Sequence, residues 1–341
     1  MPRFIRQECS TADEMGLPLR NVDAELIQKT PSIDTWSLRE ILCPDTRMQQ
    51  GIMGADAITN GAAPPDTYCL VWADRAERGV SCNGTSLSDG TLGIYGPGAS
   101  NHGVFNARSG FTLLSITATN LRARLERLGA DDGLFTEGAF ATGLIEPMLH
   151  HRLREQVHTL FRTLDHDRTT VLPGGSEHLM NVIVDGLLLG LMDRQHTQKV
   201  PERPPGGMQE RIMGLIVEHL RADREGLLSL QDLCEIGQTG ARNLQYTFQR
   251  HLGVTPTQFL RLRQLHLARR RLLDASTPSV KNAALHCGFW ELGRFSGNYR
   301  RLFGESPSAT LHCGRCLENC LDKAPPDRRR MSWLRGDIDC P

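Results

Sequence analysis

The last third of the chain repeats itself at an offset of 51 residues, and this repeat restricts the fold more than any other feature. The matched positions share glycine, proline, arginine or a large apolar side chain. They are the pairs Gly237 and Gly288, Leu244 and Phe295, Phe248 and Tyr299, Arg250 and Arg301, Leu252 and Phe303, Gly253 and Gly304, and Pro256 and Pro307. Such self-similarity indicates that one supersecondary unit has been used twice.

Each copy predicts a helix-turn-helix unit, over residues 229–251 and 279–303. In the first copy Ser229 is a suitable N-cap, and a glycine-containing turn follows at 237–240. The second helix of each copy carries an apolar stripe at a spacing of four residues, which places the stripe on one buried face. The stripe consists of Leu244, Phe248 and Leu252 in the first copy and of Phe295, Tyr299 and Phe303 in the second.

An unbroken helix is expected between the copies, over residues 256–273. At 1.5 Å per residue it is roughly 25 Å long. With the thickness of the packed helices added, it suits two recognition helices that enter the major groove one DNA turn, about 34 Å, apart. The pattern therefore favours double-stranded DNA as the partner. The alternative is a metal- or redox-dependent sensor or assembly protein whose helical region does not read DNA.

Charge is divided unevenly, although the whole chain has 39 Lys and Arg against 39 Asp and Glu. Residues 1–207 contain 19 basic and 25 acidic side chains, whereas residues 208–311 contain 14 and 9. A basic part joined to an acidic part suggests that only one of them meets a polyanion. No apolar run approaches the roughly 20 residues of a membrane span, and the N-terminus lacks a secretory signal. We therefore expect a cytoplasmic protein without a membrane partner.

The first 200 residues are expected to form a separate β-rich domain. Between residues 35 and 119, short apolar runs alternate with Gly, Asn, Asp and Pro, which is typical of a sandwich or small barrel. Apolar residues recur at helical spacing over 144–164 and 177–192, and the segment 22–28 also suggests a helix. The 177–192 helix is apolar on most sides, which favours burial in its own domain; a homodimer interface is the alternative.

Prolines and glycines at 197–207 indicate a linker to an all-α domain over 208–311. The predicted fold class is therefore α+β. It combines an N-terminal β-rich domain with helices and a C-terminal domain of two helix-turn-helix units joined by a linker helix.

The second unit resembles the AraC/XylS family of bacterial regulators through residues 280–295, VKNAALHCGFWELGRF, and 299–308, YRRLFGESPS. The first unit is similar through residues 232–234, DLC, and 242–248, RNLQYTF. Within the family, the GFWELGRF form looks closest to the subgroup that contains the ethanolamine-utilisation activator. The usual serine cap of the first recognition helix is replaced by Gly240, and Trp290 is expected at the cap position of the second.

The resemblance implies a transcription regulator, more commonly an activator, that binds promoter DNA and acts on RNA polymerase. It also implies a cupin-like N-terminal barrel that senses an unknown small-molecule effector or mediates dimerisation. These expectations concern residues 208–311 first, because the resemblance covers only about a third of the chain.

Exposed positions of the two recognition helices are the candidate DNA contacts. Arg pairs well with guanine, and Gln or Asn with adenine, in the major groove. The candidate base contacts are Arg242, Gln245, Tyr246, Gln249, Arg294 and Asn298. The candidate phosphate contacts are Arg250, Arg300 and Arg301. Gly293 and Gly297 allow a close approach of the backbone to DNA but read no base.

No cofactor and no catalytic site are predicted. In the β-rich stretch only His102 is a candidate metal ligand, and its neighbours Asn101 and Gly103 favour a loop. A flexible tail is expected over 312–341, where Cys313, Cys316 and Cys320 lie close together without a standard zinc or iron–sulfur spacing. Whether this cluster binds metal stays open.

Overall fold

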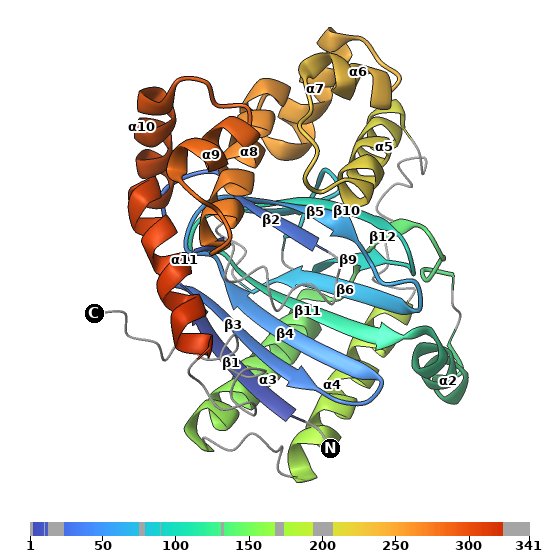
Figure 1. The fold of residues 1–341 in the computed structure, drawn as a ribbon. Coiled ribbons are helices and arrows are strands. Elements are labelled where there is room, and N and C mark those ends of the chain that lie inside the picture. Colours follow the sequence, from blue (N-terminus) through green and yellow to red (C-terminus); the bar gives the residue numbers. More distant parts are fainter. Residues whose placement is uncertain are drawn as a thin grey trace.

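The computed structural model describes residues 3–9, 11–12, 24–74, 79–88, 90–130, 133–167, 174–193 and 207–322. These residues form four layers: helices, two successive sheets, and the helices of the C-terminal part (Figure 1). The predicted α+β class is confirmed, with an antiparallel β-rich domain followed by an all-α domain. Within the described parts of the chain, no helix is long and apolar enough to cross a membrane.

Two antiparallel sheets make up the N-terminal domain. The larger has the strand order β1 (Arg3–Cys9), β3 (Trp36–Leu42), β4 (Thr46–Ile52), β11 (Gly110–Thr117), β6 (Thr67–Ala73), β9 (Thr91–Tyr95) and β12 (Phe140–Leu144). The smaller has the order β2 (Ala24–Gln28), β5 (Ala57–Ala62), β10 (Ser100–Phe105), β7 (Val80–Cys82) and β8 (Thr85–Ser86). Short strands divided by turns thus form the two-sheet arrangement that the sequence pattern indicates.

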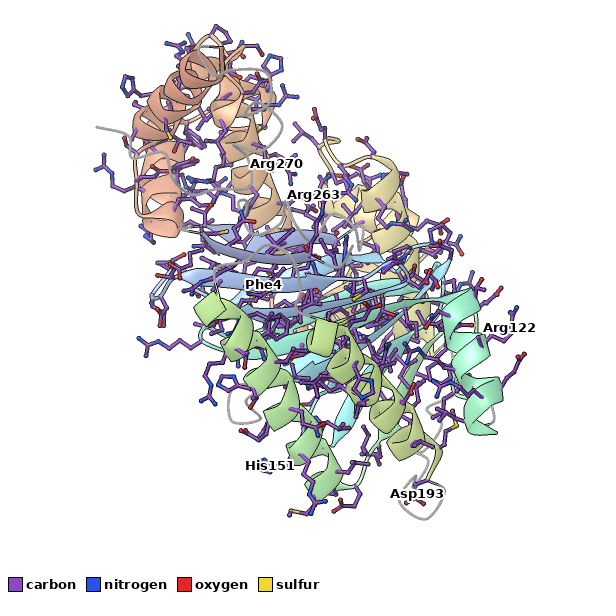
Figure 2. All side chains as sticks on the ribbon, turned by 90° about the horizontal axis from the view of Figure 1, so that it is seen from below. Phe4, Arg122, His151, Asp193, Arg263 and Arg270 are labelled. Carbon is purple, nitrogen blue, oxygen red and sulfur yellow. The ribbon has the colours of Figure 1, made fainter. Side chains whose placement is uncertain are left out.

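Side chains alternate between the two faces of each strand, and this alternation divides the core. On β11, Leu113 faces the smaller sheet, whereas Leu114 packs against the helices on the other side. Those helices are α2 (Ala118–Leu128), α3 (Pro147–Asp167) and α4 (Gly174–Met192). Figure 2 shows the layers from another side, with Phe4 between the larger sheet and α3.

Helix α4 buries most of its apolar surface in its own domain, as its composition favours. Ile183, Val184 and Leu187 are each at most 1% exposed. Val182 and Leu189 remain 44% and 50% exposed on the same helix.

Two local expectations for the N-terminal domain are wrong. Residues 24–28 form strand β2 and not a helix, because the segment pairs with β5 and buries apolar side chains on both faces. Leu26 packs between the sheets, and Ile27 packs against the C-terminal helices. His102 lies in strand β10 and not in a loop, because its neighbours pair with β5 and β7.

The C-terminal domain packs on the outer face of the smaller sheet. Its helices are α5 (Met208–Ala222), α6 (Leu230–Ile236), α7 (Ala241–Leu252), α8 (Pro256–Leu273), α9 (Val280–His286), α10 (Leu292–Phe303) and α11 (Pro307–Asp322). One core joins Ile27 and Ile58 of the sheet to α5, α6, α7 and α8. A second core holds α8, α9 and α10 together. Helix α8 therefore belongs to both helix-turn-helix units.

Residues 312–322 are helical, which differs from the flexible tail expected from residue 312. Helix α11 packs so closely on α8 that a Cβ at Gly314 would lie 2.7 Å from the carbonyl oxygen of Leu273. Arg315 also donates to the carbonyl of Pro278 over 2.9 Å. The remainder of the expected tail, from residue 323, and the side chains of Cys316 and Cys320 lie outside the described residues.

Candidate nucleic-acid interface

The first helix-turn-helix unit consists of α6 and α7. Ser229 caps α6 with a capping box, in which Ser229 Oγ accepts from Asp232 N over 3.2 Å and Asp232 Oδ2 accepts from Ser229 N over 2.7 Å. The turn between the helices places Gln238 at a φ of 50°. Gly240 is the N-cap of α7 without a side-chain hydrogen bond, as the sequence indicates. A glycine cap costs only a few tenths of a kcal/mol relative to serine, so α7 still begins there.

The second unit consists of α9 and α10, and its turn is one residue longer than the first. Ser279 Oγ caps α9 by accepting from Asn282 N over 3.1 Å, and Gly288 takes a φ of 78° in the turn. The N-cap of α10 is Glu291, so the expectation that Trp290 occupies this position is wrong. Glu291 lies 51 residues after the N-cap Gly240 of α7, so the repeat leaves Trp290 in the turn, where it is 81% exposed.

Helix α7 separates buried from exposed residues as the apolar stripe predicts. Leu244, Phe248 and Leu252 are each at most 1% exposed. All five candidate contacts of this helix are exposed: Arg242, Gln245, Tyr246, Gln249 and Arg250. Arg250 Nη1 donates to Tyr246 Oη over 3.3 Å, which brings the proposed phosphate contact next to a proposed base contact.

Helix α10 also separates buried from exposed residues, but the last residue of its buried stripe differs from the prediction. Phe295 and Tyr299 are fully buried, and Leu302 is more buried than Phe303, which packs only partly. Arg294, Arg300 and Arg301 are exposed, whereas Asn298 is half-buried. Arg301 Nη1 approaches Asn298 Oδ1 at 3.5 Å, so these two candidates lie together.

Two glycines lie on the exposed face of α10. A Cβ added at Gly293 or Gly297 would meet no other atom within 4 Å, so nothing in the described protein requires glycine there. We expect Gly297→Ala to raise the free energy of unfolding by about 1 kcal/mol through helix propensity. If this face meets DNA closely, the same variant binds DNA more weakly.

The matched control for this prediction is Gly214→Ala in α5, where an added Cβ also meets nothing within 4 Å. Urea unfolding and fluorescence anisotropy on a labelled duplex give the two readouts. A Gly297→Ala protein that is more stable and binds DNA with unchanged affinity contradicts a close approach at this face.

Arg261 is a further candidate contact that the sequence pattern does not indicate, because it lies in the helix expected to act as a spacer. Its guanidinium lies 4.7 Å from the centre of the Phe289 ring, close to the start of α10. Burial lowers the pKa of Arg261, neighbouring Arg294 lowers it further, and Glu291 opposes both. Two arginines thus lie near the N-terminus of the second recognition helix. The sequence alone does not single out Arg261, because the other four arginines of α8 contact groups of the protein itself.

The C-terminal ends of both recognition helices are held by two consecutive residues of the N-terminal domain. Gln28 Nε2 donates to the carbonyl of Leu302 at the end of α10 over 3.0 Å. Lys29 Nζ donates to the carbonyl of Leu252 at the end of α7 over 3.3 Å. Burial lowers the pKa of Lys29, and Asp56 opposes this effect. The end of strand β2 therefore contacts both helix-turn-helix units at once.

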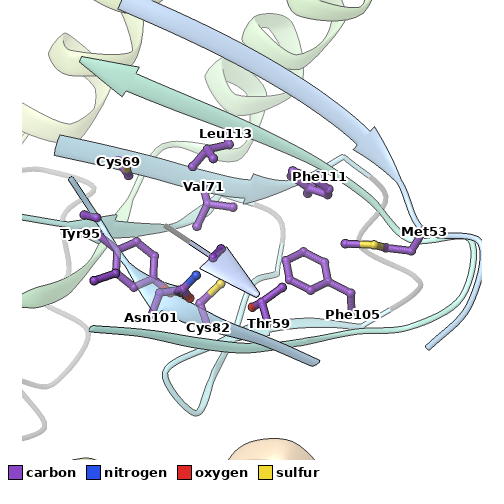
Figure 3. A pocket seen from close by; sticks show the side chains of 13 residues that line it. Met53, Thr59, Cys69, Val71, Cys82, Tyr95, Asn101, Phe105, Phe111 and Leu113 are labelled. Carbon is purple, nitrogen blue, oxygen red and sulfur yellow. Dashed lines mark hydrogen bonds between the residues drawn. The ribbon is translucent and has the colours of Figure 1, made fainter. Parts of the chain in front are cut away.

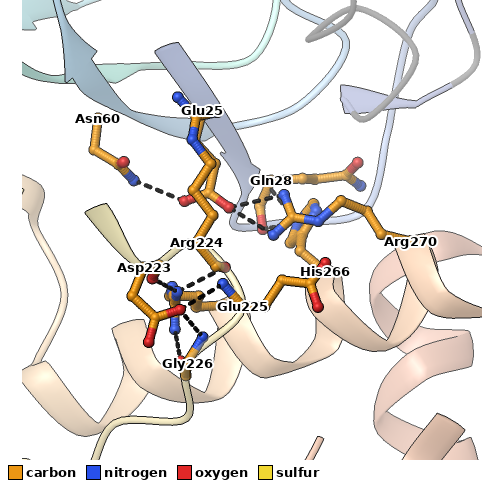
Figure 4. A network of polar contacts seen from close by, with 10 residues as sticks. Glu25, Gln28, Asn60, Asp223, Arg224, Glu225, Gly226, His266 and Arg270 are labelled. Carbon is orange, nitrogen blue, oxygen red and sulfur yellow. Dashed lines mark hydrogen bonds and ion pairs between the residues drawn. The ribbon is translucent and has the colours of Figure 1, made fainter. Parts of the chain in front are cut away.

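Further polar contacts connect the same sheet to α8 (Figure 4). Gln28 N donates to His266 Nε2 over 2.9 Å. Arg270 donates through both terminal nitrogens to Glu25 Oε1, each over 2.8 Å, and Asn60 Nδ2 donates to Glu25 Oε2 over 3.3 Å. The Glu25 side chain is only 6% exposed, so this ion pair is largely removed from water.

A histidine pair lies where β10 meets α7. His102 Nε2 and His251 Nδ1 are 2.9 Å apart, and both residues are at most 2% exposed. Burial lowers the pKa of His102 to about 3, and the neighbouring His251 adds to this effect. An unfolded histidine has a pKa of about 6.5. Between pH values of about 3 and about 6.5, His102 therefore binds a proton in the unfolded chain but not in the folded chain.

Stability is therefore expected to fall as the pH drops below 6.5, by about 1.4 kcal/mol per pH unit from His102 alone. His102→Gln, which removes the titrating ring, is expected to lower this slope. Urea unfolding between pH 5 and 7 measures the effect, with exposed His151→Gln on α3 as the control (Figure 2). Equal slopes in His102→Gln and the unsubstituted protein contradict the assignment.

No group of three or more His, Cys, Asp or Glu side chains suited to a metal ion occurs among the described residues. Cys313 is half-buried on α11, but the other two cysteines of the expected cluster have no described side chains.

Known proteins similar to this chain resemble it mainly in the helical part. A family profile described as "Helix-turn-helix domain" matches residues 233–312. The "XylDLEGF operon transcriptional activator 1" of Pseudomonas putida is 33% identical over 177 residues, which cover 51% of this chain and 47% of the relative. The chain thus matches about half the length of that relative.

Two shorter proteins are matched over most of their length. The "XylDLEGF operon transcriptional activator 2" of Pseudomonas putida is 33% identical over 148 residues, covering 42% of this chain and 90% of the relative. A crystal structure of a probable AraC family transcriptional regulator from Rhodopseudomonas palustris CGA009 is 36% identical and covers 29% of this chain and 92% of its own, with a TM-score of 0.26. Because the chain covers 90% of the second activator at 33% identity, it belongs to the AraC/XylS family of transcriptional regulators.

Proposed function

We propose that this protein binds promoter DNA through α7 and α10 and regulates transcription there. The observation that carries the proposal is the pair of equivalent helices with polar, arginine-bearing exposed faces, joined by one rigid helix. Helix α8 has 18 residues, which correspond to about 27 Å. With the packed helices at its ends, this length suits major-groove segments one turn apart.

Within this proposal, each candidate side chain of the two recognition helices contacts either a base or a phosphate. Arg242, Gln245, Tyr246 and Gln249 of α7, with Arg294 and Asn298 of α10, are the proposed base contacts. Arg250, Arg300 and Arg301 are the proposed phosphate contacts, because they lie toward the ends of the two helices. Arg261, which lies over the Phe289 ring beside α10, is a further proposed phosphate contact.

The partners and place of action are part of the same proposal. The relatives named as operon activators favour activation, and hence recruitment of RNA polymerase in the cytoplasm, over repression. The exposed Val182 and Leu189 on α4 offer an apolar contact for a second copy of the chain. The proposed closer similarity to the ethanolamine-utilisation subgroup rests on the sequence of residues 288–295 alone.

We also propose that the N-terminal domain senses a small molecule and passes the signal through the smaller sheet. This sheet is a single layer between the interior of the β-domain and the DNA-binding helices. Consecutive residues point to opposite sides: on β5, Thr59 faces the interior, while Ile58 packs in the core of the first helix-turn-helix unit. A shift at the end of β2 therefore reaches both recognition helices through Gln28 and Lys29, and a shift of β10 reaches α7 through His102.

Fluorescence anisotropy with the full chain and a pool of promoter duplexes tests DNA binding. We expect saturable binding that weakens steeply with salt, because phosphate contacts release counterions. The double variant Arg242→Ala/Arg294→Ala is expected to lose the preference for the bound duplex. If the double variant binds the same duplex with unchanged affinity and unchanged preference, the proposal is contradicted.

A further inference from the structure

A cavity of about 60 Å³ lies between the two sheets of the N-terminal domain (Figure 3). Its walls are mainly apolar and come from both sheets, with Val71 and Leu113 on one side and Phe105, Phe111 and Met53 toward one end. No lining residue among those that the structure describes carries a charged side chain. An ionised group placed there has no counterion, and burial of such a group costs several kcal/mol.

The polar side chains of the cavity are neutral. Burial raises the pKa of the Cys69 and Cys82 thiols to about 11, and burial raises the pKa of Tyr95 well above its usual value. Tyr95 Oη donates to Asn101 Oδ1 over 3.0 Å, so this hydroxyl is already engaged. Any ligand of the cavity therefore meets apolar groups and neutral hydrogen-bonding groups.

Thr59 supplies an unused hydrogen-bonding group. The residue is 7% exposed, lines the cavity, and its Oγ1 has no hydrogen-bond partner among the described residues. A buried hydroxyl without a partner costs about 1–3 kcal/mol. A ligand that accepts from or donates to this hydroxyl recovers that free energy.

The position of Thr59 also connects the cavity to the DNA-binding helices. Its neighbour Ile58 packs with α5 and α7, and its neighbour Asn60 donates to Glu25, the partner of Arg270 on α8. A ligand in contact with Thr59 thus touches the strand whose opposite face carries the helix-turn-helix units.

We propose that the sensed ligand is a small, uncharged molecule with an apolar body and one hydrogen-bonding group, which binds between the sheets on the Thr59 hydroxyl. This inference rests on the proposed sensing function of the N-terminal domain. The cavity is smaller than the apolar cavities of about 150 Å³ that accept benzene, so the ligand is about the size of benzene or smaller. Short alcohols and ketones are the chemical class that fits.

The test uses the full chain and ligand-observed NMR with small probes of similar size. The neutral probes are 1-butanol and 2-butanone, the charged probes are propionate and butylammonium, and cyclopentane lacks a hydrogen-bonding group. We expect the two neutral polar probes to bind and the charged probes not to bind. Thr59→Val keeps the shape but removes the hydroxyl, so it should weaken 1-butanol binding about fivefold and leave cyclopentane binding unchanged.

Thr159→Val, at an exposed position of α3, is the control and should bind every probe as the unsubstituted protein does. The inference is overturned if propionate or butylammonium binds as tightly as 1-butanol, if no probe binds, or if Thr59→Val binds 1-butanol normally. DNA binding is measured on the same samples, so that failure of the ligand inference can be told apart from failure of the proposed function. DNA binding without probe binding refutes the ligand inference alone. Absence of DNA binding refutes the proposed function.

Discussion

Replacement of Arg242 by alanine is expected to cost about 1–3 kcal/mol of binding free energy on the cognate duplex and to relax the preference at one base pair. Arg242 is exposed in the first turn of α7, two residues before the fully buried Leu244. A recognition helix contacts bases mainly through its N-terminal residues, so this guanidinium is placed for the edge of a guanine. Titration of cognate and scrambled duplexes measures both effects.

Arg301→Ala is the matched comparison, because Arg301 is exposed near the C-terminal end of α10. We expect it to weaken binding to cognate and scrambled duplexes about equally and to lower the salt slope by about one unit. If Arg242→Ala lost affinity for both duplexes in parallel, the placement of α7 in the major groove would be wrong.

Arg270→Met is expected to destabilise the full chain by about 2 kcal/mol. The substitution leaves Glu25 without its cation at a position where the carboxylate is only 6% exposed. Loss of one partner from a fully buried ion pair costs about 3–5 kcal/mol, and the 37% exposure of Arg270 reduces this figure. Urea unfolding measures the difference in the free energy of unfolding.

The neighbouring Arg271→Met is the control for this prediction. Arg271 pairs with Glu225 over 3.1 Å, but the two side chains are 41% and 78% exposed. Such a surface pair contributes less than about 1 kcal/mol. Equal stability losses in Arg270→Met and Arg271→Met would show that the contact between β2 and α8 does not hold the domains together.

The helix-turn-helix units were predictable because their pattern is local. An apolar stripe at a spacing of four residues, a cap such as Ser229 and a left-handed glycine such as Gly253 each act within one or two turns of helix. The longer turn before α10 also follows from the sequence, because the caps Ser229 and Ser279 lie 50 residues apart while the second helices repeat at 51.

The prediction of a helix at strand β2 was wrong because the conformation of this segment depends on residues distant in the sequence. Alone, residues 24–28 resemble a short amphipathic helix, but β5 supplies the hydrogen bonds and the C-terminal helices cover Ile27. The same holds for His102, whose partner His251 lies 149 residues away in the chain. Contacts of this range decide how the two domains meet, and single-sequence patterns do not encode them.

The candidate contacts on α7 were predicted as exposed, and they are exposed, because the stripe fixes which side of the helix is buried. Their division into base and phosphate contacts stays a prediction. Arg261 was missed since its role follows from the packing of α8 beside α10.

Selection of binding sites from a random duplex library by the full chain, followed by footprinting, tests the central claim most directly. We expect an enriched site with two protected major-groove segments about one turn apart, as the α8 spacer requires. We also expect Arg242→Ala to change the selected sequence in one segment only. Two results would contradict DNA recognition by the two units. One is the absence of any enriched sequence, and the other is a single protected segment whose sequence stays the same when Arg242 or Arg294 is replaced.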